Sequence, residues 1–157
     1  MKSSDLPQVN HIADQIHLSL PERPEVFTDK YQTFPEGAFV LENGGDIVGY
    51  GLSHPWVIGD IPPLDEFLGL PQSAPNCLYL HDVAILDEAR GRGFARELIT
   101  MMVTIGIAHR LHALALVSVY GTNMLWRRYG FNEMEDAKLV NKLSTYGESA
   151  HYMVKRV

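Results

Sequence analysis

The sequence predicts a single α/β domain over residues 1–157, a mixed central sheet flanked by helices. A continuous apolar run at 113–119 is typical of a central strand buried on both faces. A largely apolar stretch at 93–110 has the length and spacing of a helix that crosses over between strands. The Asn-Gly-Gly-Asp turn at 43–46 joins two short strand-like segments, as in a hairpin. Strands and helices that alternate in this way favour a mixed sheet.

Composition and charge limit the classes of function. The chain has 157 residues, 46% of them hydrophobic, which suffices for one core. A net charge of −6 argues against nucleic-acid binding and slightly favours cationic or neutral ligands. We find no bilayer-spanning segment and no apolar signal-peptide core, so we expect a cytoplasmic protein that does not bind membranes. Cys77 is the single cysteine, and the histidines lack ligand spacing, so we expect no disulfide and no metal.

The first half of the chain predicts a helix, a hairpin and a loop. Apolar residues recur at helical spacing over 6–16, with Ser4 or Asp5 as the cap. We expect Pro21 and Pro24 to close this helix. The hairpin strands are expected at 38–41 and 47–52.

The segment at 54–76 is rich in proline and predicts an irregular loop, with one helical turn near 64–68. Loops of this length in compact domains are often functional. This loop is therefore expected either to line a substrate pocket or to be a plain surface excursion.

The second half predicts a strand at 77–85, the long helix at 93–110 and the buried strand at 113–119. A short helix should follow Thr122 and end at Gly130, and strands should begin at Phe131 and near residue 150. The polar stripe of the long helix is narrow. We therefore expect this helix to be covered on most sides, with room for a homodimer.

A glycine-containing turn between the strand at 77–85 and the long helix carries the clearest chemical signal. Helix N-termini present unpaired N–H groups and the positive end of the helix dipole. Gly91 and Gly93 lack a Cβ, so an anion can approach the backbone, and Arg90, Arg92 and Arg96 add positive charge. These features predict a pyrophosphate site, with a simple tight turn as the alternative. The spacing fits neither a dinucleotide fingerprint nor a P-loop.

The residues around this turn also match a known family. Arg90, Gly93 and Ala95 fit the pattern Arg/Gln-x-x-Gly-x-Gly/Ala, and Gly130-Phe131 ends the later short helix in the expected place. Val83-Ala84-Ile85 is similar to the family's strand end, whose backbone pairs with a pantetheine arm. The chain thus resembles the GNAT N-acetyltransferase superfamily, over about residues 5–157 and most closely over 78–131.

The resemblance implies that acetyl-CoA binds as a co-substrate. The residues it implies for binding are Val83, Ala84, Ile85, Arg90, Gly91, Arg92, Gly93, Phe94, Ala95, Arg96, Asn123 and Trp126. Three departures matter. Trp126 stands where many members have a tyrosine general acid, and an indole N–H is no acid, so another group or water must protonate the thiolate. Asn123 is offset from the family's asparagine. The few residues before the first helix leave the family's first strand short or missing.

His81 is the first candidate for the general base, because an amine acceptor must lose a proton before it attacks a thioester. The segment Leu-Tyr-Leu-His resembles the Leu-His-Leu-His segment of serotonin N-acetyltransferase, with Tyr79 in place of the first histidine. Strand alternation predicts Tyr79, His81 and Val83 on one face and Asp82 on the other. Asp82 is the second candidate, and structural roles for both residues are the alternative.

The sequence favours an enzyme that transfers an acetyl group directly to an amine. His54 and Trp56 end the neighbouring strand and, with Tyr79, are candidates for acceptor binding; a packed strand end is the alternative. No nucleophile motif is present, so a covalent intermediate is not expected. The acceptor would be a small-molecule or peptide amine. The alternative function is a non-catalytic acyl-CoA sensor or interaction module.

Overall fold

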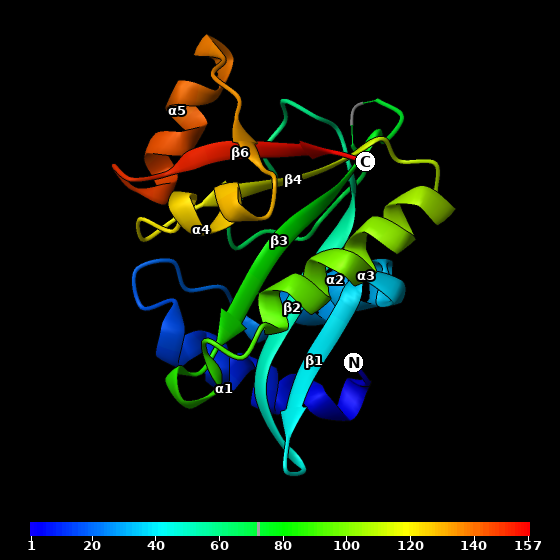
Figure 1. The fold of residues 1–157 in the computed structure, drawn as a ribbon, viewed down its shortest axis with the longest axis vertical. Helices are drawn as coiled ribbons and strands as arrows, with labels where there is room; N and C mark the ends of the chain where they lie inside the picture. Colours follow the sequence, from blue (N-terminus) through cyan, green and yellow to red (C-terminus); the bar gives the residue numbers. More distant parts are fainter. Residues whose placement is uncertain (72) are drawn as a thin grey trace.

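A six-stranded sheet in the order β1-β2-β3-β4-β6-β5 runs through the centre of the protein (Figure 1). The computed structural model describes residues 1–71 and 73–157. Strands β3 and β4 lie at the centre, and they are the one parallel pair among the described strands. The predicted mixed α/β sheet is confirmed. The strands are β1 (Ala38–Asn43), β2 (Asp46–Trp56), β3 (Cys77–Ile85), β4 (Ala113–Ser118), β5 (Asn132–Glu133) and β6 (His151–Arg156).

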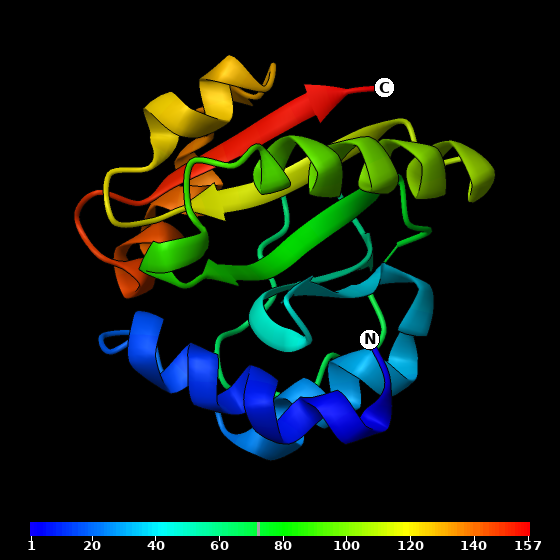
Figure 2. The same cartoon turned by 60° about the horizontal axis from the view of Figure 1, so that its bottom comes forward.

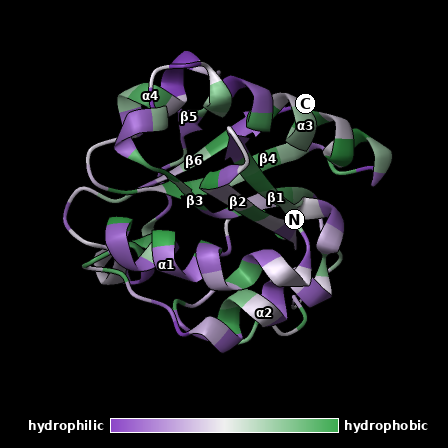
Figure 3. Cartoon of the chain, turned by 90° about the horizontal axis from the view of Figure 1, so that it is seen from below, coloured by the Kyte–Doolittle hydropathy of each residue, from purple (hydrophilic) through white to green (hydrophobic). Residues whose placement is uncertain are grey.

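Helices cover both faces of this sheet (Figure 2). On one face, α1 (Leu6–Ile16) and α2 (Pro24–Thr33) bury apolar side chains against β2. On the other, α3 (Phe94–Ala108) and α4 (Asn123–Arg128) pack on β3 and β4. A short helix, α5 (Val140–Leu143), precedes the last strand. Hydrophilic and hydrophobic residues intermingle along α1, as expected for a helix lying on a sheet (Figure 3).

The helix α2 is the main element that the sequence analysis missed. Pro24 was expected to close the first helix, but α1 ends at Ile16 and Pro24 is the first residue of α2. This position suits proline, because the first N–H of a helix has no acceptor within the helix. Buried Val26 and Phe27 hold α2 onto the sheet. The residues between α1 and α2 therefore form a turn, 17–23, that lies over the sheet.

The termini of the other elements agree with the predictions to within a few residues, with two exceptions. The loop at 57–76 forms a turn at 64–66 and no helix within its described residues. The helix α3 is not covered on most sides. Its buried residues are Leu98, Ile99, Met102 and Gly106, while Met101 and Ile107 are exposed.

Two further findings concern the ends and helices of the chain. The described residues before α1 form a 3-10 turn at Ser3–Asp5 rather than a strand, as their small number suggested. Among the described helices, none combines the length and apolarity needed to cross a membrane.

Candidate functional site

The central parallel strands β3 and β4 separate along their length. Their Cα pairing covers only Leu78–Leu114, Tyr79–Ala115 and Leu80–Leu116 in the described residues. Past these pairs the two strands diverge towards their C-terminal ends (Figure 1). We call the opening between residues 81–85 of β3 and 117–118 of β4 the fork. A strand edge without a neighbour offers its backbone groups to an extended ligand.

His81 is the extra residue of a β-bulge at the start of the fork. The register between β2 and β3 shifts, so that Leu52 pairs with Asp82 and Ser53 pairs with Leu80. A bulge of this kind breaks the alternation of side chains and re-aims them. The residues on either side of it therefore do not follow the faces that strict alternation assigns.

The predicted faces of Asp82 and Val83 are consequently wrong. His81 and Asp82 both contact groups on the α1 side of the sheet, namely Glu22 and His17. Val83 instead packs with the α3 cluster on the opposite face. Asp82 is thus a neighbour of His81 within one site rather than a residue behind it.

Glu22 from the turn 17–23 forms a buried pair with His81. Its two carboxylate oxygens lie 3.2 and 3.0 Å from His81 Nε2. The two side chains are 5% and 2% exposed. Burial raises the pKa of Glu22, but the hydrogen bond and charge of His81 and the charge of Lys30 outweigh burial and lower it to about 2. Glu22 is therefore ionised at neutral pH.

Lys30 from α2 completes this buried cluster. Its Nζ lies 3.5 Å from Glu22 Oε1 and donates to the Glu66 carbonyl at 3.2 Å. Burial lowers the pKa of Lys30, although Glu22 opposes that shift. One cation, one carboxylate and one imidazole thus lie together, buried from solvent, on the α1 side of the sheet.

A second carboxylate–imidazole pair lies closer to solvent. His17 Nε2 is 2.8 Å from Asp82 Oδ1, with both side chains 13% exposed. The Tyr50 hydroxyl donates to Asp82 Oδ2 at 2.6 Å. Burial lowers the pKa of His17, but contact with Asp82 outweighs it and raises the pKa above its usual value. Burial, followed by the Asp82 charge, raises the pKa of Tyr50, which stays protonated.

Tyr120, just after β4, connects the two sides of the fork. Its ring stacks on His17 with centroids 5.9 Å apart, and its hydroxyl accepts from Ser19 Oγ at 3.3 Å. Its φ of 55° is unusual for a residue other than glycine. The turn 17–23 thus contacts both β3 and the end of β4.

The candidates for acceptor binding lie behind His81, inside the protein. The His54 ring is 5.7 Å from the His81 ring and 5.3 Å from the Trp56 ring, between centroids. His54, Trp56 and Tyr79 are all buried. Burial, followed by the charge of His81, lowers the pKa of His54 to about 3, so it is neutral. Among the described residues, His54 Nε2, Trp56 Nε1 and His81 Nδ1 are buried without a hydrogen-bond partner.

The proline-rich loop packs against the protein instead of extending from it. Ile61 and Leu68 are buried in one cluster with Trp56. Arg23 donates through Nε to both carboxylate oxygens of Asp65, at 3.1 and 2.9 Å. The loop therefore braces the turn 17–23 that carries Glu22.

The glycine turn has the backbone geometry expected of an anion site. Gly93 is the N-cap of α3, and its φ is 87°, while Gly91 has a φ of 78°. A Cβ built at either glycine would meet nothing within 4 Å, so the space beside the backbone is open. Arg96 N–H donates back to the Gly93 carbonyl at 3.0 Å. The N–H groups of the residues before Arg96 lack intrahelical acceptors, as at any helix start.

The arginines of the turn differ in their placement. Arg90 donates through Nε to the Ile85 carbonyl at 3.0 Å and pairs with Asp87 at 2.7 Å, so it holds the turn together. Arg92 and Arg96 are exposed.

Trp126 and Asn123 of α4 are held by contacts within the protein. Trp126 is buried, packs edge-on against Phe131, and donates through Nε1 to Thr122 Oγ1 at 3.2 Å. Asn123 donates to Glu133 at 3.4 Å. The indole N–H is therefore already engaged, in addition to being too weak an acid for catalysis.

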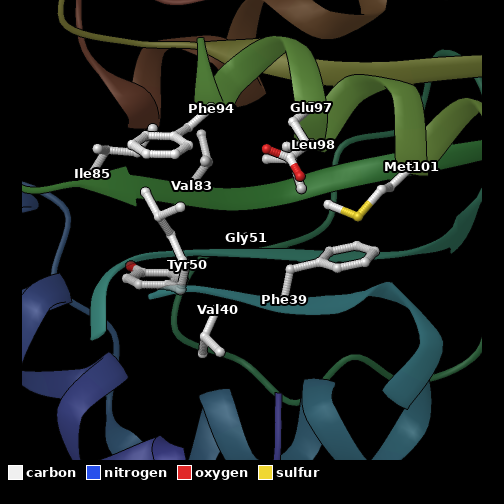
Figure 4. A pocket seen from close by; sticks show the side chains of 11 residues that line it. Phe39, Val40, Tyr50, Gly51, Val83, Ile85, Phe94, Glu97, Leu98 and Met101 are labelled. Carbon is white, nitrogen blue, oxygen red and sulfur yellow. The ribbon is translucent and has the colours of Figure 1, made fainter. Parts of the chain in front are cut away.

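An apolar groove lies between α3 and the β1–β2 hairpin (Figure 4). It encloses about 450 Å³, open solvent included. Val83, Ile85 and Phe94, three of the residues implied for acetyl-CoA, line it together with Phe39 and Met101. The groove therefore lies beside the glycine turn, on the α3 face of the sheet.

The sequence analysis did not identify Glu22, His17, Lys30 or Tyr50. Each reaches the site through a long-range contact, and Glu22 is 59 residues from His81. The one local signal was a glutamate held between Pro21 and Pro24 in a short turn. A rigid turn of this kind can place one side chain reproducibly.

Comparison with known proteins places this geometry in a family. The profile of the acetyltransferase (GNAT) family matches residues 6–131. Among proteins of curated function, none matches the chain in sequence.

Several solved structures share the fold at low sequence identity. Ard1 from Thermoplasma volcanium has a TM-score of 0.75 and 16% identity, over 100% of this chain and 94% of its own. A ribosomal-protein-alanine N-acetyltransferase from Brucella melitensis has a TM-score of 0.68 and 19% identity, over 100% of this chain and 97% of its own. The structure of Naa50 from Arabidopsis thaliana, in complex with the bisubstrate analogue CoA-Ac-MVNAL, has a TM-score of 0.69 and 13% identity. The match covers 98% of this chain and 93% of that one.

Proposed function

The chain belongs to the acetyltransferase (GNAT) family, and we propose that it transfers an acetyl group from acetyl-CoA directly to an amine. The observation that carries this proposal is the fork, which opens at His81 with two carboxylate–imidazole pairs on one face. The glycine turn to α3 follows the same strand. The binding site for the cofactor and the proton acceptor would thus be supplied by consecutive segments of β3.

Acetyl-CoA would bind with its pyrophosphate at the N–H groups of residues 91–95. The positive φ of Gly91 and Gly93 and the open space beside them support this placement. The free edge of β3 at 83–85 would take the pantetheine arm, and a backbone N–H there would stabilise the oxyanion. Arg92 and Arg96 would add positive charge from the surface.

The acceptor would approach from the side that carries the turn 17–23. Two carboxylates, Glu22 and Asp82, lie on that side, which favours a cationic ammonium over an anionic acceptor. A small-molecule or peptide amine would satisfy this chemistry. His54, Trp56 and Tyr79 would form the floor behind His81.

His81 would act as the base through one water molecule, because its side chain is almost fully enclosed. The amine lone pair would attack the thioester carbonyl carbon, and the carbon–sulfur bond would break with both electrons on sulfur. Another group or water would protonate the thiolate, since Trp126 cannot. Cys77 is no candidate nucleophile, because burial raises the pKa of its thiol to about 12.

The function can be tested by thiol release from acetyl-CoA with a panel of amines, with acetylated products identified by mass spectrometry. We expect release above background for at least one amine, with kcat/KM rising through neutral pH. His81→Ala should lower kcat/KM by roughly 10²-fold while CoA affinity stays unchanged. Full turnover in a folded His81→Ala protein would refute the assigned base.

A non-catalytic acyl-CoA sensor is the second candidate, and Trp126 in place of the tyrosine acid favours it. The same assay separates the two functions. Tight acetyl-CoA binding without thiol release for any amine would support the sensor.

A further inference from the structure

The contact between Glu22 and His81 determines which imidazole nitrogen carries a proton. Both carboxylate oxygens face Nε2, at 3.2 and 3.0 Å. An ionised carboxylate only accepts hydrogen bonds, so Nε2 must be the donor. The other nitrogen of neutral His81, Nδ1, therefore carries the lone pair.

Nδ1 is the nitrogen of His81 that is left to accept a proton. Within the described part of the chain, it is buried and has no hydrogen-bond partner. The neighbouring His54 also has an unpartnered buried nitrogen, Nε2. Buried polar atoms without partners are rare and indicate a bound water or ligand group.

We propose that Glu22 is the positioning residue of His81: it fixes the Nε2–H tautomer and stabilises the imidazolium formed when Nδ1 takes a proton. The inference rests on the proposed function. The ammonium N–H bond of the acceptor breaks, and its electron pair stays on nitrogen. The proton passes to a water at Nδ1, which gives one of its own protons to Nδ1. The arrangement parallels the carboxylate that orients histidine in a catalytic triad.

The titratable groups around His81 differ in their charge. Glu22 comes from the turn 17–23, and Lys30 from α2 lies 3.5 Å from Glu22. His54 comes from β2 and is neutral. Other titratable groups close by are Tyr79 on the same strand, with ring centroids 6.3 Å apart, and Asp82 with its partners His17 and Tyr50. Tyr146, whose pKa burial raises, lies beside Tyr79 and near Glu22.

Because Glu22 and Lys30 carry opposite charges, neutralising each of them in turn tests the role of Glu22. Glu22→Gln keeps the shape and an acceptor atom but removes the negative charge that favours imidazolium. Lys30→Met removes the positive charge that disfavours it. A positioning role predicts that the two variants shift the pH profile in opposite directions, whereas mere loss of packing would not.

The experiment is the pH dependence of kcat/KM for thiol release, in the wild type, both variants and the exposed control Glu25→Gln. In Glu22→Gln, we expect the midpoint of the ascending limb to fall by about 1 unit or more and the plateau rate to fall at least about tenfold. In Lys30→Met the midpoint should rise, and in Glu25→Gln it should not move. Unchanged or parallel midpoints in the first two variants would overturn the inference.

A second readout does not depend on turnover. Nitrogen NMR of the histidine side chains, in the wild-type protein at a pH where His81 is neutral, should show the Nε2–H tautomer for His81. Finding the Nδ1–H tautomer would overturn the inference even if the enzyme were active. Absence of thiol release from the wild type would refute the proposed function instead, and the tautomer would still decide the role of Glu22.

Discussion

At the scale of single residues, the buried ionisable groups link the site to stability. Glu22 is almost fully enclosed, and its charge depends on His81 and Lys30 as partners. Breaking a buried pair by removing one partner leaves the other charge uncompensated, which is strongly destabilising. The residues that would perform catalysis are therefore also among those that hold the turn 17–23 in place.

This arrangement predicts a specific acid sensitivity. The folded-state pKa of Glu22, about 2, lies below its usual value of 4.5. Its contribution to stability is therefore full above about pH 4.5 and is lost as pH falls towards 2. That contribution is on the order of 3 kcal/mol. In thermal melts, the difference in Tm between the wild type and Glu22→Gln should shrink steadily over this range.

The control for the acid prediction is Glu25→Gln, an exposed glutamate in the first turn of α2. Because Glu25 is exposed, Glu25→Gln should lower Tm at neutral pH by much less than Glu22→Gln does. A Tm difference for Glu22→Gln that stays constant from pH 6 to pH 2 would show that Glu22 does not have a lowered pKa.

At the scale of elements, the glycine turn before α3 is the most specific feature that could be tested by substitution. Gly93 has a φ of 87°, so any other residue there is strained. Gly44 in the β1–β2 turn has a φ of 64° and, like Gly93, open space beside it. The two glycines share a positive φ and open space beside the backbone, but only Gly93 lies at the start of a helix.

We therefore expect Gly93→Asp and Gly44→Asp to lose similar stability, while only Gly93→Asp loses affinity for CoA. A carboxylate at Gly93 would block the N–H groups and repel the pyrophosphate. The dissociation constant from calorimetry should rise by at least about tenfold, or 1.4 kcal/mol. Equal CoA affinity in both variants would remove the turn from the binding site.

At the scale of the whole molecule, local patterns predicted the sheet and missed the contacts across it. The apolar run of β4, the long helix α3 and the Gly-Gly hairpin are local signals, so they were found. The bulge at His81 is a property of how two strands pair, and alternation within one strand cannot show it. Glu22 and Tyr50 meet their partners only after folding, at separations of 59 and 32 residues.

The divergence of β3 from β4 divides the sheet into two halves, β1-β2-β3 and β4-β6-β5, paired through three residues on each strand. A ligand in the fork would bridge these halves and bind only the folded state. Acetyl-CoA at 100 times its dissociation constant should therefore stabilise the protein by about 2.7 kcal/mol. Measured by hydrogen exchange, protection beyond this global gain should appear at 81–96 and 117–124 and not in α1.

The apolar groove of Figure 4 supplies the competing outcome for this prediction. It is lined by Phe39, Val40 and Leu41 of β1, which lie outside the fork. If acetyl-CoA protected 38–43 and left 117–124 unchanged, the cofactor would occupy the groove, and the fork would not be the site of transfer. At an acetyl-CoA concentration close to the wild-type dissociation constant, Gly93→Asp should weaken the fork protection, because the pyrophosphate contact would be lost, whereas Gly44→Asp should retain it.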